Sequence, residues 1–419
     1  MSKNIVICCD GTGNEFGGRN SNVIKLYQTL KCDATQIAYY HPGVGTMGSR
    51  SALSSIGKGW TRVIGLAFGY GISDNIADAY QFLMRNYEPG DKVYIFGFSR
   101  GAFTARALCG MLFSVGLLTP GNEGLVPYAI RLMKRVVKES SANPVEPGQN
   151  FPLADDFKKT FSRPSCDACV GWCPHQCRPY FVGLWDTVSS VGWVYNAVRF
   201  PFTNANSNPH YYLVRHAMSI DERRSFFRQN SFREAFDGRK QDIQEVWFAG
   251  VHSDVGGSYP EPQSQLSKIS LRWMLDEAEN AKLPDGAGAK LQIDADRKAA
   301  ILGGKPPEVA PDATTPNQHN SLRGVWWIAE VWPKIGHKKV GNKWKKTLRF
   351  NLGRRRWIPP DPCVHASVDQ RINWVPSAPV VPASAKGLVR KPFPYKPSNV
   401  PEQHRTVGGP GGLQMAAKK

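Results

Sequence analysis

Three polar residues in this sequence each follow a short apolar run that is typical of a buried strand. Ser99 follows KVYIFGF, Asp186 follows FVGLW, and His252 follows EVWFAGV. A serine hydroxyl becomes a nucleophile when a histidine takes its proton and a carboxylate orients that histidine. The chain order of serine, acid and histidine is the one found when such a triad is built on a parallel α/β sheet. The sequence therefore predicts Ser99, Asp186 and His252 as a catalytic triad.

The glycines around Ser99 favour its interpretation as a nucleophile. Gly97 and Gly101 complete the pattern G-x-S-x-G, with a predicted strand before it and a predicted helix after it. Small residues at both positions permit a sharp turn that exposes the hydroxyl. The same pentapeptide also occurs at turns without a catalytic role, and the flanking elements are what distinguish the two cases.

Other residues could serve Ser99 instead. Asp254 follows the same predicted strand as His252, and His365 lies in CVHASVDQR near a later strand. Asp254 or His365 could therefore replace Asp186 or His252 in the triad. Asp186 could also cap the next turn, and His252 could simply bond a neighbouring carbonyl. The sequence leaves these alternatives open.

Acyl transfer also requires N–H donors for the oxyanion of its tetrahedral intermediate. The backbone of Arg100, directly after the nucleophile, is the expected first donor. Gly11 or Thr12, in the early loop CDGTGN, is the expected second donor. Asp10 is interpreted as the organiser of that loop, because a second carboxylate would oppose an oxyanion. A metal site formed by Asp10 and Asp254 is the alternative.

A cluster of cysteines could hold a structural metal. Cys166, Cys169, Cys173 and Cys177 lie within CDACVGWCPHQC, with His175 among them. Zinc accepts four such ligands, although the spacing lacks the two separated pairs of a zinc ribbon. A structural zinc and free thiols both remain open, and no cofactor is expected for catalysis. The odd number of nine cysteines does not indicate a secreted disulfide framework.

The elements that would position these residues alternate over the first 110 residues. NIVICC and QIAYYH are typical of strands, whereas NVIKLYQTL and SDNIADAYQFLMRNY are typical of helices, the second capped by Ser73 or Asp74. This alternation predicts an α/β fold with a mostly parallel, doubly wound sheet. Residues of about 120–178 break the pattern and are interpreted as an insertion that carries the Cys-rich segment. SLRWMLDEAENAKL is a later amphipathic helix.

The expected organisation is one catalytic domain, residues 1–375, followed by a disordered tail, residues 376–419. Of the net charge of +19, most lies from residue 332 onward, where there are 18 Lys and Arg but only 3 Asp and Glu. This part is expected to be loop-rich from about residue 282, and its later prolines and glycines favour disorder. A basic surface of this kind suits an anionic membrane, nucleic acid or an acidic protein.

The sequence contains no apolar stretch of about 20 residues, the length that a membrane helix requires. Its N-terminus also lacks the long apolar region and cleavage site of a secretory signal. The protein is therefore expected to be cytoplasmic as synthesised.

Five blocks of sequence together resemble a family of α/β-hydrolase domains that includes the catalytic domains of type VI secretion phospholipase effectors. The blocks are CCDGTGN, FGYGISDNIADAYQFL, PGDKVYIFGFSRGAFTARAL, GLWDTV and VWFAGVHSDVGGSY. The resemblance implies an α/β-hydrolase fold and a Ser-Asp-His lipid esterase, with Ser99 as nucleophile and support for Asp186 and His252. For an effector it also implies export by a dedicated secretion system and an immunity protein as partner. The modest length, the Cys-bearing insertion and the basic end depart from the better-known effectors.

The predicted function is a serine hydrolase that cleaves carboxylic esters of phospholipids through an acyl-enzyme at Ser99. Two alternatives remain: a small-ester hydrolase without a membrane role, and a non-catalytic protein with a hydrolase-like body that binds nucleic acid. No motif of a known nucleic-acid module favours the latter. In the lipid hypothesis, tryptophans of the basic region could enter the membrane interface; they are Trp326, Trp327, Trp332, Trp344 and Trp357.

Overall fold

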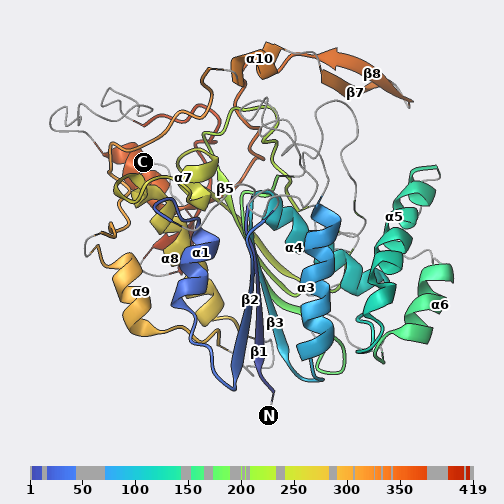
Figure 1. Cartoon of the computed structure of the whole chain (residues 1–419). Coiled ribbons are helices and arrows are strands. Elements are labelled where there is room, and N and C mark those ends of the chain that lie inside the picture. The colour runs from blue at the N-terminus through green and yellow to red at the C-terminus, as the bar shows by residue number, and fades with distance from the viewer. Residues whose placement is uncertain are drawn as a thin grey trace, which may run out of the picture.

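A nine-stranded sheet forms the centre of the part of the chain that the structure describes (Figure 1). The structure is a computed structural model and describes residues 2–11, 17–43, 71–142, 152–164, 173–188, 200, 203, 208–232, 241–282, 290–304, 307–324, 326–331, 334–340, 343–374, 395–409 and 412–415. The strand order is β11-β10-β9-β6-β5-β4-β3-β1-β2, and every neighbouring pair is parallel except β10 and β11. The prediction of a mostly parallel α/β sheet is therefore confirmed.

The strands of this sheet are β1 (Asn4–Cys9), β2 (Gln36–His41), β3 (Lys92–Phe98), β4 (Pro179–Trp185), β5 (Leu213–Ser219), β6 (Asp242–Phe248), β9 (Cys363–His365), β10 (Arg405–Gly409) and β11 (Gly412–Met415). The helices are α1 (Asn22–Thr29), α3 (Ile72–Asn86), α4 (Arg100–Ser114), α5 (Val126–Ala142), α6 (Pro152–Phe161), α7 (His252–Gly256), α8 (Gln265–Glu279), α9 (Ala295–Leu302), α10 (Trp326–Val331) and α11 (Ala366–Asn373). A separate hairpin is formed by β7 (Lys334–Val340) and β8 (Lys343–Arg349).

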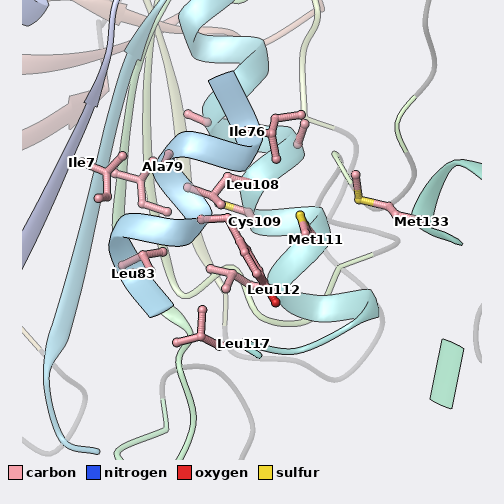
Figure 2. Close-up of a cluster of buried hydrophobic side chains, with 14 of the residues drawn as sticks. Ile7, Ile76, Ala79, Leu83, Leu108, Cys109, Met111, Leu112, Leu117 and Met133 are labelled. Atoms are coloured by element: carbon pink, nitrogen blue, oxygen red, sulfur yellow. The ribbon is translucent and has the colours of Figure 1, made fainter. Parts of the chain in front are cut away.

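Helices cover both faces of the sheet, because the central strands carry apolar side chains on each face. In β1, Ile5 and Ile7 point into a core shared with α3, α4, α5 and α6, whereas Val6 and Cys8 point into a core shared with α1, α8 and α9. Figure 2 shows the first core, with Ile7 of β1 facing side chains of α3 and α4. This two-sided burial makes the strands continuous apolar runs, which is why the sequence reveals them.

The carboxyl ends of the parallel strands meet at one end of the molecule, opposite the N-terminus (Figure 1). β1 lies between β2 and β3. From β1 the chain forms β2 on one side, and then β3 and the later strands on the other side, so the strand order reverses here. Ligands of doubly wound folds bind outside the carboxyl strand ends near such a switch point. α7 and α10 lie at this same end.

Two expectations about local structure, the cap of α3 and the loop-rich region, need correction, and the insertion has secondary structure of its own. The α3 helix begins at Ile72, with Gly71 at the cap in a left-handed conformation (φ 103°) in place of a capping Ser73 or Asp74. The insertion of residues 120–178 contains α5 and α6, and both pack against α4. The region expected to be loop-rich contains α9, α10, α11 and the strands β7, β8 and β9.

The prediction of a disordered tail is wrong for residues 395–409. Arg405, Thr406 and Val407 of β10 pair in parallel with β9 and extend the central sheet. Tyr395 and Val400 pack against a third apolar core at this edge. The sequence of β10, RTVGG, carries only a weak strand signal. Its extended conformation therefore depends on pairing with β9, which local sequence does not show. Residues 376–394 lie outside the described part of the chain.

Within the described residues, no helix combines the length and the apolar character that crossing a membrane would require.

Candidate active site

Ser99 lies on a strained turn between β3 and α4. Its backbone has φ 58° and ψ −119°, a conformation that residues with a side chain rarely adopt and that marks functional turns. Gly97 and Gly101 make the turn possible. A Cβ on Gly97 would lie 2.6 Å from the backbone of Ala102, and one on Gly101 would lie 2.1 Å from the carbonyl oxygen of Cys9. Both glycines are therefore required by close backbone approach, as the nucleophile interpretation predicts.

Asp186 and His252 are brought together from the ends of β4 and β6. Nδ1 of His252 lies 2.6 Å from Oδ2 of Asp186, and both side chains are buried. Asp186 has a positive φ of 40°, and its N–H donates to the carbonyl oxygen of Ala217 at the end of β5. This bond turns Asp186, which directly follows β4, toward β5.

A buried guanidinium holds the carboxylate of Asp186 in place. Nη1 of Arg356 lies 2.5 Å from Oδ1, and Nη2 lies 3.1 Å from Oδ2. The backbone N–H of Ser219 donates to Oδ1 at 3.0 Å and its hydroxyl donates to Oδ2 at 3.1 Å. Burial alone would raise the pKa of Asp186, but Arg356 and His252 outweigh burial and lower that pKa. Asp186 is consequently ionised at neutral pH.

The ring of His252 lies between two phenylalanines. Phe98, the residue before Ser99, stacks on it with ring centroids 4.7 Å apart, and Phe227 packs edge-on at 4.8 Å. Gly256 of α7 leaves room for Phe98, because a Cβ there would lie 1.9 Å from that ring. Burial lowers the pKa of His252 below its usual value, although Asp186 acts in the opposite direction. The imidazole is therefore neutral at neutral pH.

Glu222 adds a second carboxylate behind His252. Its Oε2 accepts a hydrogen bond from the backbone N–H of His252 at 3.3 Å, and Arg224 donates to both of its oxygens. Burial would raise the pKa of Glu222, but Arg224 lowers it to about 2. This carboxylate fixes the start of α7, where His252 lies.

Of the three residues expected to supply oxyanion donors, the structure describes Arg100 and Gly11. Arg100 is the first residue of α4, and N–H groups of a first helical turn point out of the helix end. The N–H of Gly11 donates to Oδ1 of Asp10 at 2.6 Å, so it already has an acceptor. Thr12 lies outside the described residues. Asp10 also accepts hydrogen bonds from the side chains of Ser21 and Tyr40, as expected for an organiser of this loop.

The alternative partners Asp254 and His365 have other contacts. Asp254 accepts from Nδ1 of His319 at 2.6 Å and from the backbone N–H groups of Val251 and His319. His365 bonds the hydroxyl of Ser367 at 2.8 Å, stacks on Phe248, and has its pKa lowered to about 4 by burial. The geometry thus associates Asp186 with His252 and associates neither alternative with that pair.

The proposed zinc ligands are described only in part. Cys173 and Cys177 are buried free thiols, whereas Cys166 and Cys169 lie outside the described residues. Burial raises the pKa of Cys177. Across the described ranges, no group of three or more His, Cys, Asp or Glu side chains is arranged to hold a metal ion. This also applies to Asp10 and Asp254, and nothing positively supports a structural zinc.

Three residues of the candidate site were not found by sequence reasoning. Ser219 and Glu222 end or follow β5, whose apolar run is interrupted by Arg215 and His216, so the strand that positions them is not recognised from the sequence. Arg356 comes from an irregular segment and carries no strand-end signal.

Comparison with known protein families assigns the chain to a family. A family model described as the catalytic domain of Tle1-like phospholipase effectors of the type VI secretion system matches residues 3–277, well over half of the chain. The chain belongs to this family. The resemblance inferred from the sequence is therefore confirmed.

A relative and two solved structures are also similar to this chain. The uncharacterized protein YEL023C of Saccharomyces cerevisiae is 38% identical, and the alignment covers 97% of this chain and 81% of the yeast protein. The crystal structure of an uncharacterized protein from Pseudomonas aeruginosa is 19% identical over 74% of this chain and 49% of that one, with a TM-score of 0.41. The structure of the Tle1 effector bound to the VgrG spike is 20% identical over 63% and 52%, with a TM-score of 0.32. This chain thus spans about half the length of each solved structure.

Proposed function

We propose that this Tle1-like domain is a serine hydrolase that cleaves carboxylic esters of phospholipids through an acyl-enzyme at Ser99. The observation that carries the proposal is the buried bond between Asp186 and His252 beside the turn that holds Ser99. An ionised carboxylate only accepts hydrogen bonds, so Nδ1 of His252 carries the proton and Nε2 keeps a lone pair. Membership of a phospholipase effector family supports ester hydrolysis.

In the proposed reaction, Oγ of Ser99 attacks the ester carbonyl carbon while its proton passes to Nε2 of His252. The tetrahedral intermediate then expels the alcohol, which takes that proton, and the acyl group stays on Ser99. A water molecule, deprotonated by His252, then attacks the acyl carbon and releases the fatty acid, and His252 returns that proton to Oγ of Ser99. Asp186 remains ionised throughout and stabilises the imidazolium, while the N–H of Arg100 stabilises the oxyanion.

The composition of one hairpin and the exposure of two tryptophans favour a substrate presented at a membrane. The hairpin β7–β8 carries seven Lys and Arg and no Asp or Glu, and it lies with α10 at the end of the molecule where the carboxyl strand ends meet (Figure 1). Trp357 and Trp327 expose 69% and 45% of their surface. Basic residues attract anionic lipid headgroups, and indole rings partition into the interface. Export by a secretion system and an immunity partner remain predictions.

Active-site labelling tests the proposal. A fluorophosphonate is expected to label the intact protein, and Ser99→Ala is expected to abolish both labelling and hydrolysis of micellar phospholipid. Ser114→Ala, at the other end of α4, serves as the control and should retain both fluorophosphonate labelling and phospholipid hydrolysis. An intact protein that takes up no label, or a Ser99→Ala variant that still takes it up, rules out this nucleophile. Faster hydrolysis of a short-chain ester in solution than of phospholipid would favour a small-ester hydrolase.

A further inference from the structure

A pocket of about 260 Å³ lies beside the candidate triad, between residues 222–229 and residues 351–357. Three of its lining residues contact the triad, because Arg356 bonds Asp186, Phe227 packs against His252, and Glu222 accepts from the backbone N–H of His252. Six arginines line the pocket: Arg223, Arg224, Arg228, Arg354, Arg355 and Arg356. The candidate active site uses two of them, Arg356 to hold Asp186 and Arg224 to hold Glu222.

The two segments are bonded to each other, so the pocket is a fixed part of the fold. Nε of Arg223 donates to the carbonyl oxygen of Gly353 at 2.6 Å. Glu330 of α10 accepts from the backbone N–H groups of Ser225 at 2.6 Å and Gly353 at 3.1 Å. This buried carboxylate therefore connects both walls of the pocket to the helix above them.

Carboxylates compensate only half of the arginine charge. Glu222 pairs with Arg224, Asp221 with Arg355, and Asp186 with Arg356. The arginines without an ion pair to any described carboxylate are Arg223, Arg228 and Arg354. Among the described residues that line the pocket, Glu222 is the only acidic one, so this lining carries a clear excess of positive charge.

An excess of guanidinium groups selects a particular ligand chemistry. Arginine binds phosphate through paired, charge-assisted hydrogen bonds, which a neutral ester cannot form. A cationic headgroup such as choline would be repelled by the same charges. The exposed indole of Trp357 on this wall can contact the lipid interface while the phosphate enters the pocket.

We propose that this arginine pocket binds the phosphate of an anionic phospholipid headgroup and so selects the substrate of the neighbouring Ser99. The identity of the bound lipid as a substrate rests on the proposed function, but binding itself does not require catalysis. The test therefore uses full-length Ser99→Ala protein, in which binding is separated from turnover.

Arg228 and Arg354 are suitable for substitution because both are exposed and neither forms an ion pair with a described carboxylate. Arg228→Gln/Arg354→Gln is expected to weaken binding to phosphatidylglycerol vesicles about tenfold in a sedimentation assay and to leave weak binding to phosphatidylcholine vesicles unchanged. The control is Arg131→Gln/Arg135→Gln, which removes two exposed arginines from a different hollow on α5. Equal weakening by both pairs, or no weakening by the first, overturns the proposal.

Soluble competitors distinguish a lipid phosphate from a free phosphate. Glycerophosphoglycerol, the deacylated headgroup, is expected to displace the vesicles, and inorganic phosphate at the same concentration and ionic strength is expected to be at least tenfold weaker. Equal or stronger competition by inorganic phosphate overturns the assignment to a headgroup. If the pocket binds lipid but Ser99 takes up no fluorophosphonate in the intact protein, the proposed function fails while the binding site stands.

Discussion

At the scale of single residues, Arg356 connects the basic C-terminal region to the candidate chemistry. Its side chain is 5% exposed and pairs with an equally buried Asp186. Removing one member of such a buried pair typically costs about 3–5 kcal/mol, because the other charge is left uncompensated. Arg356 acts through Asp186 on His252 and is therefore a positioning residue.

Arg356→Gln is expected to lower kcat/KM for a soluble ester by about 100-fold, the scale of one lost electrostatic contact at an active site, and to move the acid limb of the pH profile upward. Burial lowers the pKa of His252, so the intact enzyme stays active as the pH falls below about 6.5, the ordinary value for histidine. Without the guanidinium, the uncompensated charge of Asp186 stabilises the imidazolium. His252 then protonates, and activity is lost, at a higher pH.

Two further variants separate this role from a purely structural one. Arg356→Lys keeps the charge but not the bidentate geometry, so it should recover part of the rate with an acid limb near that of the intact enzyme. Arg272→Gln removes an exposed arginine on α8 and should change neither quantity. An Arg356→Gln variant that loses activity with an unmoved acid limb would contradict the prediction.

The sequence predicts the residues at strand ends better than those elsewhere. Asp186 follows β4, which is buried throughout, and His252 follows β6, whose last three residues are buried. In each case the apolar run indicates the strand, and the end of the run gives the position of the polar side chain. Arg356 reaches Asp186 from an irregular segment 170 residues further along the chain. No local pattern encodes that contact, because it depends on where the C-terminal region folds back.

At the scale of elements, the position of Ser99 depends on how closely α4 crosses the end of β1. The backbone of Gly101 lies so near the carbonyl oxygens of Cys9 and Asp10 that a Cβ would lie 2.1 Å and 2.5 Å from them. Neither oxygen can move freely, because Cys9 is the last residue of a central strand and Asp10 directly follows it. Any added side-chain atom must therefore displace the helix that Ser99 caps.

Gly101→Ala is expected to destabilise the protein by about 1–3 kcal/mol, as overpacking a tight contact does, and to reduce activity at temperatures where the variant is still folded. Gly124→Ala adds the same methyl group where no atom lies within 4 Å and serves as the control. Thermal unfolding and ester hydrolysis measure the two effects. Equal melting temperatures for the two variants would show that the crossing is not tight.

The strands that the sequence does not predict, β5 and β10, were missed for the same physical reason. β5 reads LVRHAMS, in which Arg215 and His216 interrupt the apolar run, yet both are buried because Glu277 and Glu245 pair with them. β10 has only Val407 in a core and owes its extended form to the ladder with β9. Long-range pairing, which local sequence does not display, decides both cases.

At the scale of the whole molecule, residues 395–409 attach the end of the chain to the site. The hydroxyl of Tyr395 donates to Oδ2 of Asp221 at 2.8 Å, and Nδ2 of Asn399 donates to the carbonyl oxygens of Ile220 and Arg356. These bonds hold the segment after β5, which leads to Glu222 and the arginine pocket. The C-terminal segment thus supports the site from outside the region that the family model matches.

Removing residues 395–419 is therefore expected to lower the melting temperature by several degrees, since a loss of 1 kcal/mol shifts the transition of a large domain by about 2–4 °C, and to reduce ester hydrolysis. Tyr395→Phe, which loses only the bond to Asp221, should produce a smaller change of the same sign. A shortened protein with unchanged melting temperature and activity would restore the interpretation of this segment as a disordered tail.

The pairing of Asp186 with Arg356 also has a consequence for synthesis. The ribosome produces Ser99, Asp186 and His252 in that order, and more than a hundred further residues must follow before the guanidinium that compensates Asp186 exists. A growing chain that already contains Ser99, Asp186 and His252 therefore still lacks the guanidinium that completes the site. If the activity is hydrolysis of membrane lipid, the protein becomes able to damage the membranes of the cell that makes it only after Arg356 has been added to the chain.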